Sequence, residues 1–286
     1  MDVNKIYHGD SRNMDKIDDE SVHLTITSPP YYVGKDYESY LAEIDDYFQM
    51  LYGVLNEVVR VTVPGGKIII NLGDIAVGSN YNENGFPEEI PVMLGLVSHL
   101  RELKAYLYAR IIWEKDDPWA NSSHVSFHSK IQHAEYRVLP AWEYVFVFRK
   151  GEKARTDDNV NGDRWITKDS WKKLVHGIWR IRSVQRNDFH EAMFPEELVK
   201  RCIKLYSFPG DIVLDPFMGS GTVAMVAKKL ERRYLGYDLD ADYVDYAIRR
   251  IETVSEDMNM IEKQEPYRDK TVNKVLQDEF LDDISV

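Results

Sequence analysis

Four consecutive residues, Ser28-Pro29-Pro30-Tyr31, could hold a flat substrate through its hydrogen-bond donors. They directly follow an apolar segment, Val22–Thr27, that is typical of a buried strand. The prolines have no backbone N–H, so carbonyl oxygens and the Ser28 hydroxyl are left as acceptors beside the rings of Tyr31 and Tyr32. Acceptors next to aromatic rings suit a planar group that carries an amine, such as a nucleobase. A second interpretation stays open, in which this is a proline-rich turn with both tyrosines packed in the core.

A glycine loop later in the chain could hold a cofactor. It runs from Asp215, at the end of an apolar segment, through Pro216–Thr222 into a helical pattern. Glycines let a ligand approach the backbone, and the amino end of a helix favours a negative group such as a carboxylate. Asp238 ends the next strand pattern, where an acid can accept hydrogen bonds from ribose hydroxyls. Together they predict a nucleoside-containing cofactor, although the loop alone would also fit a nucleotide-binding oxidoreductase.

Both motifs require a sheet to position them. Seven segments rich in Val, Ile, Tyr and Phe predict strands. They are Lys5–His8, Val22–Thr27, Lys67–Leu72, Ala105–Glu114, Trp142–Arg149, Ile212–Asp215 and Arg233–Asp238. Helical patterns lie between several of them, most clearly at Tyr47–Arg60, Gly221–Leu230 and Asp242–Ile251. This alternation predicts an α/β fold with a doubly wound, mostly parallel, seven-stranded sheet, whose ligands bind at the carboxyl ends of the strands.

The order of the two motifs resembles the β-class (permuted) amino-methylating DNA methyltransferases of the N4-cytosine and N6-adenine type. Ser28-Pro29-Pro30-Tyr31 matches their catalytic motif [DNS]-P-P-[YFW], and it precedes Phe217–Gly221, which matches their cofactor motif F-x-G-x-G. Further stretches that resemble family segments are His8–Ser11, Pro64–Lys67, Ile111–Lys115 and His190–Leu198. The resemblance covers most of residues 4–251 and implies a circularly permuted, Rossmann-like methyltransferase fold that uses S-adenosyl-L-methionine.

The resemblance also implies which residues form the site. Ser28, Pro29, Pro30 and Tyr31 would handle the target base. Phe194 and Pro195 would wall the methionine end of the cofactor. The cofactor would lie along Asp10, Asp215, Phe217, Gly219, Ser220, Gly221, Thr222 and Asp238.

The chemistry explains why the catalytic motif needs acceptors. The lone pair of an exocyclic amine is delocalised into the base, so the amine is a poor nucleophile. Acceptors at the Ser28 hydroxyl and the Pro29 carbonyl would hold its two hydrogens and favour a pyramidal nitrogen, which attacks the sulfonium methyl group in line. Tyr31 would stack on a base flipped out of the duplex.

The resemblance favours cytosine N4 as the methylated atom, because serine in the first motif position tends to accompany it in this family. Adenine N6 is the alternative. The same constellation acting on RNA or protein, and a catalytically silent DNA-binding subunit, also stay open.

A basic stretch could contact double-stranded DNA. Residues 149–190 hold eleven basic and six acidic residues, a net charge of +5, with Trp165, Trp171 and Trp179 among them. The residues that we expect to touch DNA are Arg164, Lys168, Lys172, Lys173, Arg180, Arg182 and Arg186. A solvated basic loop whose tryptophans pack in the core is the alternative. Residues 121–133 are a second candidate for contacting the groove.

The motifs divide the chain into four expected parts. Residues 1–150 would be the catalytic half of the methyltransferase domain and residues 188–251 its cofactor-binding half. Residues 151–187 would be a target-recognition insert, and residues 252–286 an acidic tail.

The overall charge of −12 argues at first against a polyanionic partner, because phosphate contacts need Lys and Arg. The basic stretch limits that objection, since it concentrates positive charge where DNA could touch. We therefore expect modest DNA affinity that falls steeply with salt.

The other composition signals narrow the class of protein. The single cysteine, Cys202, lies in an apolar helical pattern, so we expect a core thiol and not a C5-methylating nucleophile. His124, His128 and His133 lack metal-ligand spacing, and we expect no metal. No signal peptide or membrane span is indicated, which favours the cytoplasm. A separate cognate restriction endonuclease and a homodimer are partners that the resemblance leaves open.

Overall fold

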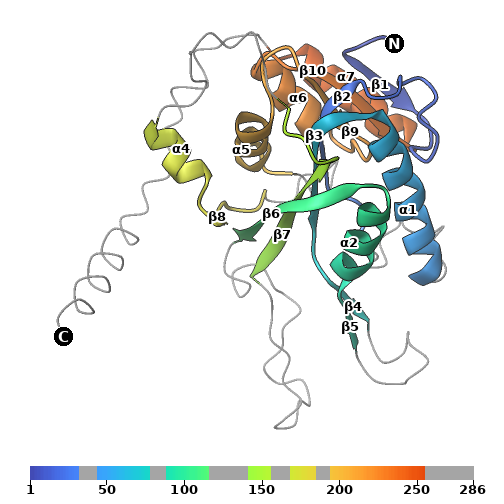
Figure 1. The fold of residues 1–286 in the computed structure, drawn as a ribbon. Helices are drawn as coiled ribbons and strands as arrows, with labels where there is room; N and C mark the ends of the chain where they lie inside the picture. Colours follow the sequence, from blue (N-terminus) through green and yellow to red (C-terminus); the bar gives the residue numbers. More distant parts are fainter. Residues whose placement is uncertain (32–43, 78–87, 116–140, 156–167, 185–193, 255–286) are drawn as a thin grey trace, which may run out of the picture. The chain divides into compact units, whose positions relative to one another are not determined.

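The computed structural model describes residues 1–31, 44–77, 88–115, 141–155, 168–184 and 194–254, which all belong to one unit spanning Met1–Val254. An eight-stranded sheet lies at its centre, with the strands in the order β1-β10-β9-β2-β3-β7-β6-β8 (Figure 1). The strands are β1 Lys5–His8, β2 Val22–Thr27, β3 Thr62–Leu72, β6 Ala105–Glu114, β7 Trp142–Lys150, β8 Ile178–Arg180, β9 Ile212–Asp215 and β10 Arg233–Asp238. A separate two-stranded sheet joins β4 Ile75–Val77 to β5 Glu88–Ile90.

The doubly wound α/β fold class is confirmed, with one strand more than we expected. All seven expected strands are present, and β8 adds an eighth at the edge, where Trp179 pairs with Trp113 of β6 in parallel. Three residues are too few to show a strand pattern in the sequence. β3 also begins earlier than we expected, because Pro64-Gly65-Gly66 forms a bulge between the pairs Val22–Thr62 and Leu24–Lys67.

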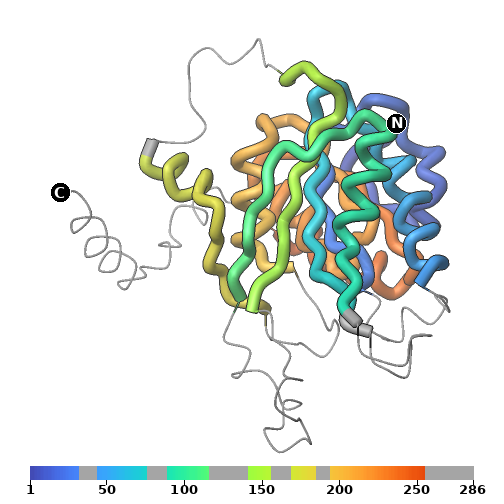
Figure 2. Tube along the Cα trace, turned by 60° about the horizontal axis from the view of Figure 1, so that its bottom comes forward, coloured from blue at the N-terminus to red at the C-terminus, as the bar shows by residue number. Residues whose placement is uncertain are grey.

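Parallel pairing joins the strands that carry the two motifs. β1, β10, β9, β2 and β3 are parallel neighbours, whereas β7 runs antiparallel to both β3 and β6. Figure 2 shows β3, β7 and β6 side by side. Because of these directions, the last residues of β2, β3, β6, β9 and β10 and the first residues of β7 meet at one edge of the sheet.

Helices cover both faces of the sheet. They are α1 Ile44–Val61, α2 Val92–Glu102, α4 Lys168–Leu174, α5 Glu196–Tyr206, α6 Thr222–Lys229 and α7 Ala241–Glu252. α1 and α2 lie on one face, while α5 and α6 lie on the other (Figure 1). The faces follow from the period of two along a strand, because Ile68 and Ile70 of β3 pack with α1 and α2, whereas Ile69 between them points the opposite way.

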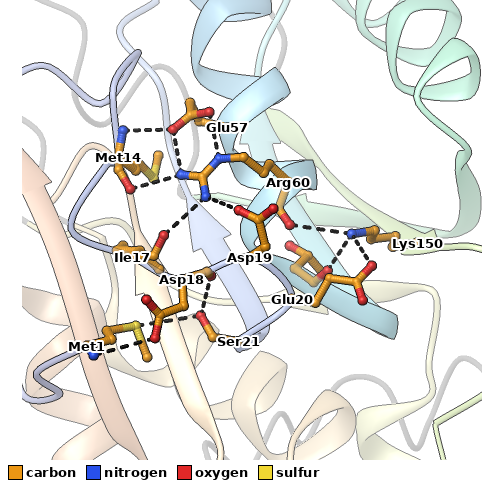
Figure 3. Close-up of polar contacts among 11 residues, drawn as sticks. Met1, Met14, Ile17, Asp18, Asp19, Glu20, Ser21, Glu57, Arg60 and Lys150 are labelled. Atoms are coloured by element: carbon orange, nitrogen blue, oxygen red, sulfur yellow. Dashed lines mark hydrogen bonds and ion pairs between the residues drawn. The ribbon is translucent and has the colours of Figure 1, made fainter.

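An arginine anchors the segment that connects β1 to β2 (Figure 3). Arg60, in the last turn of α1, donates hydrogen bonds to the carbonyl oxygens of Met14 and Ile17 and to the carboxylate of Glu57. It also pairs with Asp19, and Glu57 accepts the backbone N–H of Met14. These bonds fix residues 14–19 against α1, and so fix the chain that follows Asp10.

Cys202 lies fully buried in α5, as expected of a core thiol, and burial raises its pKa strongly. None of the helices in the described ranges is long and apolar enough to span a membrane. Several residues named from the sequence lie outside the described residues, namely Arg164, Arg186, Trp165, His124, His128, His133 and the tail from residue 255; of Lys168 only the backbone is described.

Candidate active site at the carboxyl edge of the sheet

A cavity of about 810 Å³ opens at the carboxyl edge of the parallel strands. Residues that follow β1, β2, β9 and β10 line it, together with residues at the end of β6 and the start of β7. This edge is where open α/β sheets bind their ligands, and the volume suits a cofactor-sized molecule.

Most residues that the motifs single out line this cavity. Those that line it are Asp10, Ser28, Pro29, Pro30, Tyr31, Phe194, Asp215, Phe217, Gly219, Ser220, Thr222 and Asp238. Pro195 and Gly221 do not line it. The structure therefore brings the two motifs to one hollow, although they are about 190 residues apart in the chain.

The pairing of β2 with β9 causes this meeting. The hydroxyl of Thr27, the last residue of β2, donates to the carboxylate of Asp215, the last residue of β9, over 2.8 Å. The same carboxylate oxygen accepts the backbone N–H of Phe217 at 3.1 Å. One buried aspartate thus joins the end of the catalytic strand to the start of the glycine loop.

Two acids give the loop an affinity for cations. Burial raises the pKa of Asp215 to about 8, against the opposing effect of its bonds from Thr27 and Phe217. Burial also raises the pKa of Asp238, whose oxygens accept the backbone N–H groups of Gly219 at 2.7 Å and Asp240 at 3.0 Å. A cation in the cavity would favour the ionised form of both acids, so each would bind it more tightly once deprotonated.

Gly221 shapes the loop from behind the cavity. It caps α6 with φ at +78°, a conformation that favours glycine. A Cβ there would lie 2.8 Å from Cβ of Ala247 on α7. From the same helix, the Arg250 guanidinium donates to the carbonyl and hydroxyl of Ser220 and to the hydroxyl of Thr222, at 3.0–3.1 Å. Gly221 and Arg250 therefore fix the loop against α7.

Asp10 reaches the cavity from the end of β1. The Arg12 side chain donates to both oxygens of its carboxylate, and the Arg12 backbone N–H donates to one of them at 2.9 Å. These bonds lower the pKa of Asp10 and keep it ionised. Asp10 is thus a fixed acceptor on the rim beside the glycine loop.

The catalytic turn is held from two sides. The hydroxyl of Tyr47, on α1, donates to the carbonyl oxygen of Pro30 at 2.8 Å. The hydroxyls of Ser28 and Tyr31 lie 2.9 Å apart. The Tyr31 hydroxyl in turn reaches the Glu143 carboxylate at 3.0 Å, so Tyr31 connects the turn to β7. Tyr31 packs partly against the core and also lines the cavity, so both interpretations of this residue hold in part.

Sequence reasoning missed the polar residues beneath Tyr31. Glu143 at the start of β7 and Asn71 near the end of β3 are both buried and line the cavity. The ammonium group of Lys115 pairs with Glu143 and lies 4.7 Å from the ring centre of Trp113. A signal for both did exist, since Glu143 and Asn71 interrupt otherwise apolar strand patterns.

The basic residues proposed for DNA contact lie outside the cavity. Lys172 and Lys173 are exposed on α4, and Arg180 and Arg182 are exposed on and after β8, where Arg180 pairs with Glu114 at 2.9 Å. The neighbouring Ser183 and Val184 do line the cavity. This chain segment therefore runs from an exposed basic surface to the mouth of the site.

The tryptophans of this stretch divide between core and surface. Trp179 is fully buried, whereas Trp171 is 52% exposed. Trp113 also ties the segment down, because its indole donates to the carbonyl oxygen of Ile181 at 2.7 Å. The alternative in which these tryptophans pack in the core therefore holds for Trp179 and not for Trp171.

No group of His, Cys, Asp or Glu suited to hold a metal ion occurs among the residues that the structure describes. The polar groups that line the cavity are carboxylates, hydroxyls, an amide, an ammonium and backbone groups. They can hold an organic cofactor and an amine through hydrogen bonds.

The chain matches known proteins along most of its length. A family model described as DNA methylase, of the N6 and N4 type, matches residues 22–249. The Type II methyltransferase M.BglI of Bacillus subtilis is 29% identical, over 87% of this chain and 86% of that protein. The Type II methyltransferase M.MjaI of Methanocaldococcus jannaschii is 31% identical, over 82% of this chain and 87% of that protein.

Solved structures agree. A putative DNA modification methylase from Thermus thermophilus, complexed with S-adenosyl-L-methionine, is 30% identical and superposes with a TM-score of 0.69, over 87% of this chain and 93% of that chain. PvuII DNA methyltransferase, described as cytosine-N4-specific, superposes with a TM-score of 0.66 over 91% of each chain. Its identity of 21% supports the fold alone.

Proposed function

We propose, from the premise that this chain belongs to the DNA methylase family of the N6 and N4 type, that it methylates the N4 amine of cytosine in double-stranded DNA. Family membership makes it a DNA amino-methyltransferase that uses S-adenosyl-L-methionine. The proposal adds the base. The observation that carries it is the shared cavity, in which the Ser28 hydroxyl lies on the same wall as the glycine loop.

The residues of the loop fit this cofactor. S-adenosyl-L-methionine carries a sulfonium and an ammonium group, and two acids with raised pKa values, Asp215 and Asp238, flank the loop. The backbone N–H bonds leave lone pairs on the Asp238 oxygens that can accept ribose hydroxyls. Phe194 and Phe217 supply apolar lining. When bound, the cofactor supplies an electrophilic methyl group.

The turn residues would act on the base. The Ser28 hydroxyl and the Pro29 carbonyl accept the two amine hydrogens, which frees the nitrogen lone pair for attack on the methyl group. The chain contributes orientation and a prearranged set of acceptors, and forms no covalent bond to the base. The amine of a paired base is out of reach, so the base must first leave the duplex and stack on Tyr31.

Support for cytosine N4 comes from Ser28, which stands first in the catalytic motif. A serine hydroxyl holds an amine hydrogen without adding a charge beside the electrophilic centre. Lys172, Lys173, Arg180 and Arg182 would contact the DNA backbone and bring the duplex to the mouth of the cavity. The names of the Type II relatives support a role in restriction and modification, opposite a separate endonuclease of the same specificity.

Incubation with tritiated S-adenosyl-L-methionine and mixed-sequence duplex DNA tests the proposal. After digestion to nucleosides, we expect the label in N4-methylcytosine. Label in N6-methyladenine would refute the base and leave the family intact. Label in RNA or protein, with none in DNA in parallel reactions, would refute the DNA substrate.

A matched pair of serine variants tests the role of Ser28. Ser28→Ala should keep the affinity for the cofactor and lose about 10²–10³-fold in turnover, the usual effect of removing one prearranged hydrogen-bond partner. Ser21→Ala is the control, because the Ser21 hydroxyl bonds to the carbonyl oxygen of Asp18 and does not line the cavity (Figure 3). Equal turnover in both variants would remove Ser28 from the mechanism.

A further inference from the structure

Beneath the catalytic turn lies a polar cluster, Glu143, Asn71 and Lys115, that neither sequence motif contains. One oxygen of the Glu143 carboxylate lies 3.0 Å from the Tyr31 hydroxyl and 3.1 Å from the Asn71 side-chain nitrogen. Its other oxygen pairs with the Lys115 ammonium group. The carboxylate is buried but paired and hydrogen-bonded, which is how a buried charge is kept in a protein.

The cluster fixes the direction of the hydrogen bond between Ser28 and Tyr31. The Asn71 nitrogen donates to Glu143 and to the carbonyl oxygen of Tyr144 at 2.9 Å, so its amide oxygen faces Tyr31 at 3.3 Å. Tyr31 thus meets two acceptors, and its own hydrogen must point to one of them. Burial and the neighbouring carboxylate raise the pKa of Tyr31, so it keeps this hydrogen.

It follows that Ser28 is the donor in its 2.9 Å contact with Tyr31. With its one hydrogen committed to Tyr31, the Ser28 oxygen has only lone pairs left to present elsewhere. Holding an amine hydrogen requires an acceptor of this kind. A chain of hydrogen bonds therefore runs from Ser28 through Tyr31 to Glu143 and ends on a carboxylate.

We propose that Glu143 is a positioning residue that orders this chain and takes up, through Tyr31 and Ser28, the proton released by methyl transfer. The inference deepens the proposed function and depends on it. It goes beyond the motif residues, because it gives a residue of β7 a part in the reaction although it touches neither the base nor the cofactor.

The step balances in atoms and charge. The amine nitrogen bonds to the methyl carbon while the bond from that carbon to sulfur breaks, and its electron pair stays on sulfur as a neutral thioether. The nitrogen, now cationic, gives a proton to the Ser28 oxygen, Ser28 gives its own hydrogen to Tyr31, and Tyr31 gives its hydrogen to Glu143. The sulfonium and carboxylate charges both disappear, while Lys115 stays an ammonium ion.

Single-turnover methylation of duplex DNA, with cofactor and DNA saturating, tests the chain. Glu143→Gln and Tyr31→Phe should each lower the rate by about 10²-fold or more, the usual range for proton transfer by a side chain. The double variant should be no slower than the slower single variant, because both changes interrupt one chain. Cofactor affinity should stay within about threefold of wild type. The matched control is Glu57→Gln, which breaks an ion pair with Arg60 away from the cavity.

The pH profile separates proton uptake from a purely structural role. The wild-type rate should fall at acid pH, where the Glu143 carboxylate becomes protonated, and this acid limb should vanish in Glu143→Gln. Glu143→Asp keeps a carboxylate and should recover part of the rate, together with the limb. Without any cofactor, the shifts in urea midpoint caused by Tyr31→Phe and Glu143→Gln should not add, because the two side chains contact each other.

The outcomes distinguish the two proposals. If the wild type does not methylate DNA, the proposed function fails. If the wild type methylates DNA but Glu143→Gln stays within threefold of it, or if the losses of the two single variants multiply in the double variant, the chain through Glu143 is wrong. Should Glu143→Gln unfold, Tyr31→Phe and Glu143→Asp decide, since an unchanged rate and an unchanged acid limb in Tyr31→Phe would equally refute it.

Discussion

Replacing Asp215 by asparagine should change how the stability of this protein depends on pH. Asp215 is 3% exposed, and one of its oxygens accepts hydrogen bonds from Thr27 and Phe217. An asparagine side-chain oxygen can accept the same two bonds, so Asp215→Asn preserves the local structure and removes only the titrating proton. Thr27 and the loop should stay in place.

The magnitude follows from linkage between protonation and folding. Burial raises the pKa of Asp215 to about 8 in the folded protein, against an ordinary value of 3.8 in the unfolded chain. Between these values the folded state holds a proton that the unfolded state has released. Stability from this group is therefore complete below pH 3.8 and is lost as the pH rises toward 8. The free energy of unfolding should fall by about 1.4 kcal/mol per pH unit from this group, or about 2.7 kcal/mol between pH 5 and pH 7.

Urea unfolding of both proteins at several pH values between 5 and 8 measures this difference. We expect the wild-type free energy of unfolding to fall more steeply with pH than that of Asp215→Asn, by up to the slope above. Asp10→Asn is the control, because Arg12 lowers the pKa of Asp10 and any stability from that group is lost only as the pH falls below this window. Parallel curves for the wild type and Asp215→Asn would refute a buried, protonated Asp215.

Two further predictions concern the loop and the basic surface. Gly221→Ala should lower the free energy of unfolding by about 1–3 kcal/mol in urea, since it combines a positive φ with a Cβ contact of 2.8 Å to Ala247; unchanged stability would contradict the close approach of α6 to α7. Replacing Lys172 and Lys173 together by alanine should make the dependence of log DNA affinity on log salt concentration less steep by about 2, with unchanged cofactor affinity; an unchanged salt slope would exclude phosphate contacts at α4.

The sequence by itself determined the fold class and the two motifs. Strand patterns such as Val22–Thr27 and Ile212–Asp215 are local, and so are a proline pair and a glycine loop that leads into a helix. Each depends on the backbone preferences of a few adjacent residues, which survive in any tertiary context. The short strand β8 escaped this reasoning, because three residues owe their conformation to pairing with β6 and not to a pattern of their own.

Only the tertiary structure decided which side chains share the site. Thr27 and Asp215 meet because β2 lies beside β9, and Glu143 lies beneath Tyr31 because β7 enters the sheet antiparallel to β3, next to the end that carries Asn71. Strand order and register are set by burial summed over the whole sheet, so they leave no local trace at a single acid or amide. The sequence can show that a polar residue interrupts an apolar strand, but only the folded sheet shows which group it bonds.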